Sequence, residues 1–297
     1  MKTEQQKASS GLWPRTYRGL AAAGRKLLGL LPDSAAQALG RALARAIPNP
    51  MDRLMMNTIQ AGPLAGMKIY GNALKSRAYI EGGHEPEVVA WLQEHCSPGT
   101  RAVDIGSHEG YLMLLMAKQV GPAGEVFAFE PIPDLYEGLR KTLGANKLDW
   151  VRVENKAMGE AKGRQQIHLQ ESGRSASHSM APAEDSEKVL EIQVSSLDSY
   201  FGKLSWPRID LIKIDVEGYE AAVFRGASRF FEEQKPKLIL ELHLWNDPLE
   251  LVEGLDRLGY RFEQLDGRAC TPGEIKERYT AGRGDTMIVV GFPRERG

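Results

Sequence analysis

At two points of this 297-residue sequence an acidic residue lies where an apolar run gives way to a turn, and glycines accompany it at the first point. Residues 103–110 read Val-Asp-Ile-Gly-Ser-His-Glu-Gly, and residues 127–131 read Phe-Ala-Phe-Glu-Pro. Glycine permits the tight turns that bring a backbone close to a ligand. Carboxylates that follow strands of a parallel sheet lie at the edge where such sheets bind ligands. These turns predict a site for a ligand that carries positive charge or donates hydrogen bonds.

The glycine spacing of the first turn does not fit the dinucleotide motif G-x-G-x-x-G. Either alignment places two non-glycine residues at glycine positions, Asp104 with Glu109 or His108 with Tyr111. A pyrophosphate would also meet Asp104 and Glu109 without a lysine or arginine in the turn. S-adenosylmethionine (SAM) carries an ammonium and a sulfonium group, which suit these charges. We therefore predict SAM as the cofactor and not a nicotinamide dinucleotide.

Glu130 ends the second apolar run, 24 residues beyond Gly106. A carboxylate at about this spacing binds the hydroxyls of an adenosine ribose, because its oxygens accept several hydrogen bonds. The alternative is a carboxylate that caps the following helix. Together with the turn at Asp104, the spacing favours the ribose role.

Asp215, Glu241 and His243 end two further apolar runs. Residues 241 and 243 point to the same side of a strand, because side chains alternate along it. His243 is a candidate general base, oriented by Asp215 or Glu241. Alternatively, the three side chains ligate a divalent cation such as Mg²⁺, or they form structural hydrogen bonds only. Glu217 and Glu220 open a predicted helix, where carboxylates stabilise the positive end of the dipole.

Short apolar runs alternate with helical patterns along most of the chain, which is typical of a parallel sheet with helices on both faces. We predict an α/β, Rossmann-like fold with a mostly parallel seven-stranded sheet. The predicted strands of this sheet are residues 102–105, 126–129, 151–153, 209–214, 238–242, 260–264 and 287–290. The predicted helices are residues 85–94, 110–119, 135–143 and 253–258, besides the helix that Glu217 and Glu220 open.

Two segments stand apart from this alternation. Residues 165–169 and 190–194 are predicted strands that flank a polar loop, residues 171–187, which is either a lid or a solvated hairpin tip. Residues 1–60 are a predicted helical extension, followed by a domain over 61–297 with its core at 101–297. The basic helices of the extension are interpreted as a cap or dimer arm, or as a weak peripheral membrane contact through residues 15–47.

Composition excludes several function classes. The formal net charge of −1 gives no basic field for nucleic acid, and no apolar run approaches the roughly 20 residues of a membrane-spanning helix. Cys96 and Cys270 lie far apart without a partner motif, which favours a reducing compartment. We predict a soluble cytoplasmic protein, and the sequence leaves its oligomeric state open.

The sequence resembles the FkbM family of SAM-dependent methyltransferases, which have the class I methyltransferase fold. The resemblance covers roughly residues 79–245 and rests on four matched stretches. These are residues 103–111, Phe129-Glu130-Pro131, Ser196-Leu197-Asp198, and residues 213–220, which read Lys-Ile-Asp-Val-Glu-Gly-Tyr-Glu. The sequence departs from the family at residues 107–109, where Ser-His-Glu replaces the more common Ala-Asn-x.

The resemblance implies roles for individual residues. The turn at Asp104 would hold the methionyl part of SAM, Glu130 the ribose, and residues 154–158 would border the adenine, while Asp215 would face the reacting methyl group. The implied cofactor-binding set is Asp104, Gly106, Ser107, His108, Gly110, Glu130, Pro131, Asn155, Ala157 and Asp215. The candidate catalytic set is His243, Asp215 and Glu241.

The resemblance also implies a reaction, which is in-line methyl transfer to a hydroxyl of a sugar, glycan or secondary metabolite. An N-methyltransferase that acts on a small-molecule amine is one alternative. A catalytically silent SAM-binding or scaffolding module is another.

Overall fold

The computed structural model describes residues 54–73, 76–169, 178–179, 188–244, 248–281 and 286–294. The chain divides into two compact units, Met1–Arg53 and Leu54–Gly297, and every described residue belongs to the second. The predicted N-terminal helices, the proposed membrane contact of residues 15–47 and most of the loop 171–187 lie outside the described residues. The domain boundary at residue 60 stays a prediction. Within the described residues, no helix is both long and apolar enough to span a membrane.

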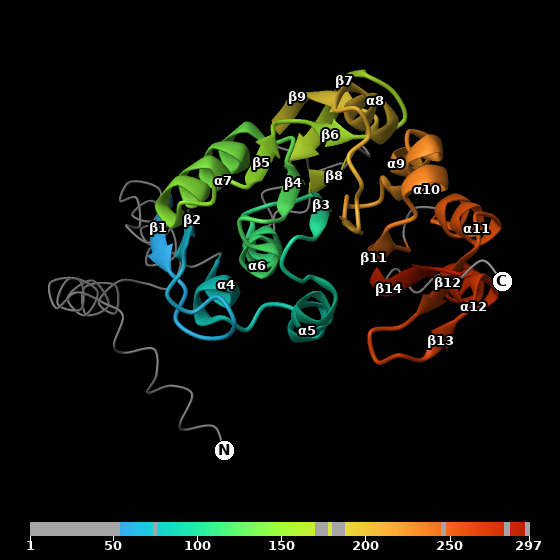
Figure 1. Ribbon diagram of the computed structural model, residues 1–297. Helices are drawn as coiled ribbons and strands as arrows, with labels where there is room; N and C mark the ends of the chain where they lie inside the picture. Colours follow the sequence, from blue (N-terminus) through green and yellow to red (C-terminus); the bar gives the residue numbers. More distant parts are fainter. Residues whose placement is uncertain are drawn as a thin grey trace, which may run out of the picture. The chain divides into compact units, whose positions relative to one another are not determined.

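One eight-stranded sheet forms the centre of the second unit (Figure 1). Its strands, in spatial order, are β13 (Ala269–Cys270), β12 (Tyr260–Glu263), β14 (Thr286–Pro293), β11 (Lys237–His243), β10 (Leu211–Ile214), β3 (Arg101–Ile105), β4 (Glu125–Phe129) and β5 (Val151–Glu154). The strands from β11 to β5 run parallel, whereas β14 is antiparallel to both β11 and β12. The predicted Rossmann-like sheet is confirmed. It has one strand more than predicted because the two-residue β13 extends its edge.

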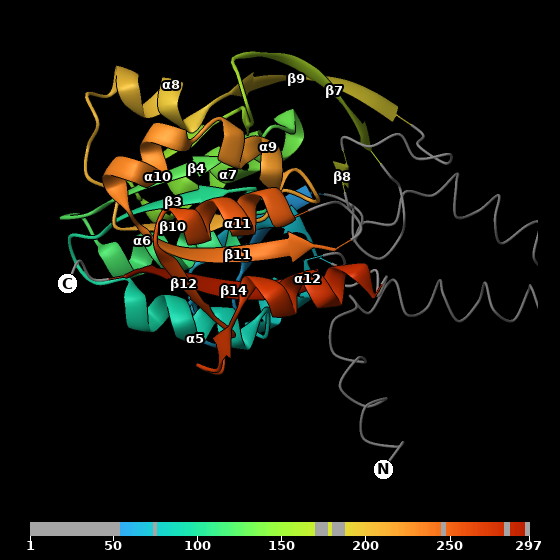
Figure 2. The ribbon, with the colours of Figure 1, turned by 90° about the vertical axis from the view of Figure 1, so that its right-hand side faces the viewer.

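Helices cover both faces of this sheet (Figure 2). One face packs against α5 (Pro86–His95), α6 (Tyr111–Val120) and α7 (Pro133–Asn146). The other packs against α8 (Leu197–Lys203), α9 (Glu220–Arg225), α10 (Ser228–Gln234), α11 (Leu249–Arg257) and α12 (Pro272–Thr280). Neighbouring strand residues alternate between the two layers, as Ala102 and Val103 do. Strands buried on both faces read as continuous apolar runs, which is why the sequence reveals them.

Two small sheets complete the described fold. The first contains β6 (Ala157–Met158), β9 (Lys188–Ser195), β7 (Gly163–Leu169) and β8 (His178–Ser179), in that order. Its β7 and β9, which contain the two strands predicted around the polar loop, pair antiparallel. The second contains β1 (Leu54–Thr58) and β2 (Lys68–Asn72), and α4 (Arg77–Glu81) follows it.

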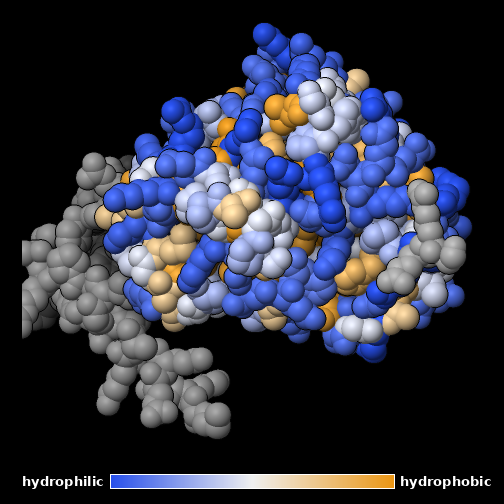
Figure 3. Space-filling view, viewed as in Figure 1, coloured by the Kyte–Doolittle hydropathy of each residue, from blue (hydrophilic) through white to orange (hydrophobic). Residues whose placement is uncertain are grey.

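The molecular face seen in Figure 3 is mainly hydrophilic, with apolar residues in small separate patches. The large exposed apolar side chains of the described residues are Leu54, Met55 and Met56 on β1 and Val189 on β9. Apolar burial is therefore concentrated in the two layers against the central sheet. The polar and charged side chains of the candidate site lie where β3, β4, β10 and β11 end.

Candidate active site

A cavity of about 260 Å³ lies at the carboxyl edge of the central sheet, where β3, β4, β10 and β11 end. The parallel strands bring together residues that are far apart in sequence, as the predicted fold requires. The predicted site residues that line the cavity are Asp104, Gly106, Ser107, His108, Glu130, Pro131, Ala157, Asp215 and Glu241.

Gly106 allows the turn after β3 to pass against the end of β10. Its φ is +79°, and a Cβ at this position would lie only 1.8 Å from the carbonyl oxygen of Asp215. The glycine is therefore required by contact with the chain itself, whereas the sequence suggested close approach of a ligand. The Ser107 hydroxyl donates to the Asp104 carbonyl at 3.1 Å, which tightens the same turn.

A buried lysine, Lys213 on β10, lies at the centre of the site. Its ammonium is 3.3 Å from Asp104 Oδ1 and 3.3 Å from Asp215 Oδ2, and it donates to the Gly106 carbonyl at 3.1 Å. Although burial opposes its charge, these two carboxylates raise the pKa of Lys213. Lys213 is thus a permanent cation that ties β3 to β10.

Lys213 corrects the charge argument made from the sequence. From the sequence, we expected Asp104 and Glu109 to lie together in a turn without a lysine or arginine. In the structure, only Asp104 of the two lines the cavity, and Lys213 offsets its charge. The signal was present in the sequence, because Lys213 is the one cationic residue within the apolar run Leu-Ile-Lys-Ile of β10.

Asp104 still offers an acceptor to a ligand. It is fully buried, and its Oδ2 has no hydrogen-bond partner among the described residues. The Tyr111 hydroxyl, at the start of α6, is likewise buried without a described partner and its residue also lines the cavity. Buried polar atoms normally have partners, so Asp104 Oδ2 and the Tyr111 hydroxyl are candidates for contact with a ligand.

Glu130 joins the turn after β3 to the end of β4. One carboxylate oxygen accepts from the His108 backbone N–H at 2.8 Å, and the other accepts from that of Ile132 at 2.9 Å. Burial raises the pKa of Glu130 to about 7, although these two backbone bonds lower it. Each oxygen keeps an acceptor position for a further donor. The predicted ribose contact is therefore compatible with this arrangement.

His243 is held by Glu220, a carboxylate on α9. The imidazole Nδ1–H donates to Glu220 Oε1 at 2.6 Å, and both side chains are about 2% exposed. The sequence pointed instead to Asp215 or Glu241 as the orienting carboxylate and gave Glu220 a helix-stabilising role. Glu220 also accepts from the Gly218 backbone N–H at 3.1 Å, so it fixes the turn before α9 as well.

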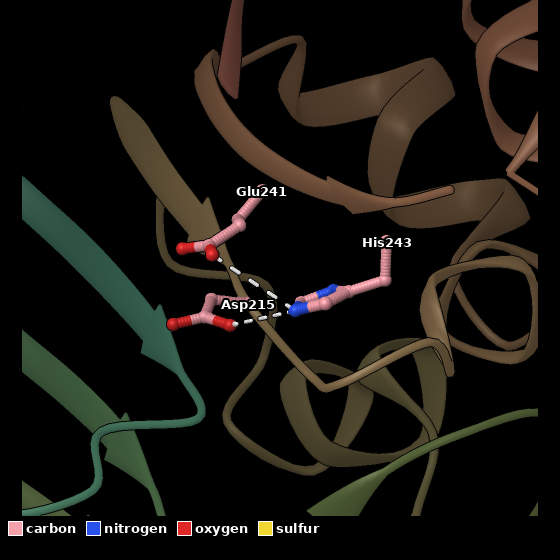
Figure 4. A group of neighbouring side chains, drawn as sticks. All are labelled: Asp215, Glu241 and His243. Atoms are coloured by element: carbon pink, nitrogen blue, oxygen red, sulfur yellow. Dashed lines mark ion pairs between the residues drawn. The ribbon is translucent and has the colours of Figure 1, made fainter. Parts of the chain in front are cut away.

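The other ring nitrogen of His243 faces three carboxylates. Its Nε2 lies 3.5 Å from Glu217 Oε2, 3.9 Å from Glu241 Oε1 and 4.0 Å from Asp215 Oδ1. Figure 4 shows the carboxylates of Asp215 and Glu241 turned toward the imidazole. Asp215 and Glu241 line the cavity, and His243 lies directly behind them.

The surrounding charges shift the proton affinities of this group. Although burial opposes the imidazolium, the hydrogen bond with Glu220 and the neighbouring carboxylates raise the pKa of His243. Burial, with Asp215 and Glu85, raises the pKa of Glu241 to about 7. These carboxylates favour the imidazolium form of His243, and its role as a general base stays a prediction.

The segment before the central sheet supplies cavity residues that sequence reasoning missed. Tyr79 on α4 stacks on Tyr111 with ring centroids 5.5 Å apart, and His84 Nε2 lies 2.9 Å from Glu85 Oε1. Glu85 has a φ of +41°, and two other non-glycine residues that line the cavity, His108 and Glu217, also have positive φ. Such backbone strain collects at functional sites.

Three predicted residues support the cavity without lining it. Gly110 has a φ of +88° directly before α6, and a Cβ there would lie 2.4 Å from the Leu139 side chain. The amide of Asn155 donates to the carbonyls of Glu130 and Pro131 at 3.0 and 2.9 Å. With His243, these residues position the cavity wall.

One protein-family model matches the part of the chain that contains most of these site residues. The family model described as "Methyltransferase FkbM domain" matches residues 104–262, which run from β3 to β12. A solved structure of a methyltransferase FkbM from Methylobacillus flagellatus KT is 18% identical, with a TM-score of 0.42, over 69% of this chain and 50% of that chain.

Two curated relatives are protein-L-isoaspartate O-methyltransferases. The one from Caenorhabditis elegans is 31% identical over 37% of this chain and 51% of its own length. The one from Ignicoccus hospitalis is 37% identical over 20% of this chain and 29% of its own length. The chain therefore spans about half or less of the length of these relatives.

Proposed function

We propose, from the premise that this chain belongs to the FkbM family of SAM-dependent methyltransferases, that it methylates a hydroxyl oxygen of a sugar, glycan or secondary metabolite. The observation that carries the proposal is the convergence of Asp215 and Glu241, backed by His243, on the cavity that Asp104 and Glu130 also line. The cavity thus combines acceptors for a cofactor with groups that can take a proton.

The residues of the cavity fit SAM. The buried Asp104 Oδ2 is an acceptor for the ammonium of the methionyl part, and Glu130 has acceptor positions for ribose hydroxyls. Ala157 and Ile132 contribute apolar surface to the wall of the cavity. SAM supplies an activated methyl group on its sulfonium, so the protein's work is to align an acceptor and to receive its proton.

A hydroxyl acceptor explains the acidic wall. An aliphatic hydroxyl is a very weak acid. Its methylation therefore requires a base that accepts the proton or a cation that lowers the pKa of the hydroxyl. Asp215 and Glu241 are carboxylates that line the cavity. His243 lies next to them and is itself oriented by its hydrogen bond to Glu220. A divalent cation bound by the same side chains would serve the same end by acidifying the hydroxyl directly.

The names of the curated relatives suggest an isoaspartyl carboxylate as an alternative acceptor. Glu85, Asp215, Glu217 and Glu241 all line this cavity, whereas Lys213 is already paired with Asp104 and Asp215. A further carboxylate in such surroundings is repelled. The acidic wall therefore favours a neutral hydroxyl, and it also favours the second candidate, methylation of an amine.

Radiolabelled methyl transfer from SAM tests the proposal. We expect label on neutral glycosides or hydroxylated metabolites, as a base-stable ether, and none on an isoaspartyl peptide. Base-labile label on the peptide would contradict the hydroxyl assignment, as would label on amines alone. Saturable SAM binding without transfer to any acceptor would indicate a silent module.

We also propose that the protein works in the cytoplasm on a small-molecule or glycan acceptor and does not bind nucleic acid. The support is the pair of buried free cysteines, Cys96 and Cys270, and the near-neutral charge of the chain.

SAM affinity is expected to fall as the pH drops below about 7, because Glu130, whose pKa is about 7, must be ionised to accept two ribose hydroxyls. The dissociation constant should rise toward about tenfold per pH unit in the acid limit. Calorimetric titrations from pH 6 to pH 8 measure this slope. Glu130→Gln should bind SAM weakly with a flat profile, and an unchanged slope in that variant would contradict the role of Glu130.

A further inference from the structure

The carboxylates around His243 Nε2 are spaced as the ligands of one metal ion are. The oxygens of Glu217, Glu241 and Asp215 lie 3.5, 3.9 and 4.0 Å from this nitrogen, whereas charge-assisted hydrogen bonds are about 2.7–2.9 Å long. Two ligands of one divalent ion, each about 2.0–2.5 Å from it, lie roughly 3–5 Å apart. One ligand atom each from Asp215, Glu241 and His243 lies within 4.8 Å of the others, which fits a shared ion.

Glu220 gives the imidazole the orientation of a metal ligand. Metal-binding histidines usually donate their second ring N–H to a carboxylate, which fixes the tautomer and aims the other nitrogen at the ion. The bond from His243 Nδ1 to Glu220 Oε1, at 2.6 Å between two buried side chains, has this form. It makes Nε2 the nitrogen that faces Asp215 and Glu241.

The local charge also calls for a cation. Glu85, Asp215, Glu217 and Glu241 line this part of the cavity, and Lys213 is shared between Asp104 and Asp215. The carboxylates thus outnumber the Lys213 ammonium and the His243 imidazole that face them in a partly buried space. A doubly charged ion between Asp215 and Glu241 would relieve their repulsion.

We propose that Asp215, Glu241 and His243 bind a divalent first-row transition-metal ion, for which Mn²⁺ serves as the probe, with Glu217 in reach as a fourth ligand. The imidazole distinguishes this site from the Mg²⁺ site suggested by the sequence, because Mg²⁺ prefers oxygen ligands alone, whereas mixed carboxylate and imidazole sets suit first-row ions. Binding of the ion rests on geometry. Its role, which is to hold the acceptor hydroxyl and lower its pKa, rests on the proposed function.

Equilibrium dialysis of Mn²⁺ against the full chain, previously stripped with a chelator, tests the site without an activity assay. We expect one bound ion per chain and weaker retention of Mg²⁺. Glu241→Gln should weaken Mn²⁺ binding by at least about tenfold, and Glu220→Gln by about 10–100-fold through loss of imidazole orientation. Glu253→Gln, on the exposed side of α11, should bind Mn²⁺ as the native chain does. Thermal unfolding confirms that each variant is folded.

The ion site is overturned if the native chain retains no Mn²⁺, or if folded Glu241→Gln binds it as tightly as Glu253→Gln does. Hydroxyl methylation that persists at full rate in the stripped protein would contradict the role of the ion and leave the proposed function standing. Mn²⁺ binding lost in Glu241→Gln, with no hydroxyl acceptor ever methylated, would support the site and contradict the proposed function.

Discussion

Asp215→Asn is expected to lower kcat by about 10²–10⁴-fold, the usual effect of losing a group that handles the reacting proton. The carboxylate of Asp215 lines the cavity, and its Oδ1 faces His243 Nε2. Asparagine keeps the shape of the side chain but removes the charge. Because Asp104 and Glu130 remain in place, the dissociation constant of SAM should change by less than about tenfold.

Asp210→Asn provides the matched control for this variant. Asp210 precedes the same strand, β10, but accepts from the Arg101 backbone N–H at the opposite edge of the sheet. Release of S-adenosylhomocysteine gives kcat, and calorimetry gives SAM affinity. Equal kcat values for the two variants would contradict the placement of Asp215 at the reacting centre.

Gly106→Ala is expected to destabilise the fold by about 3 kcal/mol or more and to abolish SAM binding. The new Cβ would lie 1.8 Å from the Asp215 carbonyl oxygen, at a φ of +79°. A left-handed conformation costs a non-glycine residue about 1–2 kcal/mol, and an overpacked contact adds about 1–3 kcal/mol. Relief of the clash must separate the ends of β3 and β10, which would move Asp104 away from Lys213.

Gly267→Ala isolates the clash from the backbone conformation. Gly267 has a φ of +82°, and a Cβ added there would meet no atom within 4 Å beyond its chain neighbours. It should therefore lose about 1–2 kcal/mol only, with SAM affinity unchanged. Urea unfolding and SAM titration compare the two variants, and a Gly106→Ala protein as stable as Gly267→Ala would refute the close contact between β3 and β10.

The sheet was predictable from the sequence because its strands are buried on both faces. The apolar runs at residues 102–105 and 238–242 identify β3 and β11 without knowledge of their partners. Carboxylates at the ends of such runs, Asp104 and Glu130, must then meet at one edge. Strand β13 has only two residues, which is too short for the apolar run or the alternation that identifies a strand. The sequence therefore does not reveal this eighth strand.

The partners of these residues depend on tertiary contacts that no local pattern records. Glu220 begins a helix, where stabilisation of the helix dipole already explains a carboxylate. Its contact with His243 depends on the fold, which the sequence pattern does not reveal. Lys213 pairs with Asp104 through strand neighbours that are 109 residues apart. Tyr79 and Glu85 precede the central sheet and reach its cavity through α4 and α5, whose placement the sequence does not specify.

Calorimetric titration of the full chain with SAM, S-adenosylhomocysteine and NAD is the most direct test of the cofactor assignment. The account predicts one saturable site per chain for both adenosyl ligands and no heat with NAD. It also predicts SAM affinity at least about tenfold weaker in Asp104→Asn, which loses the buried carboxylate charge. Strong binding of NAD, with no response to either adenosyl ligand, would contradict it.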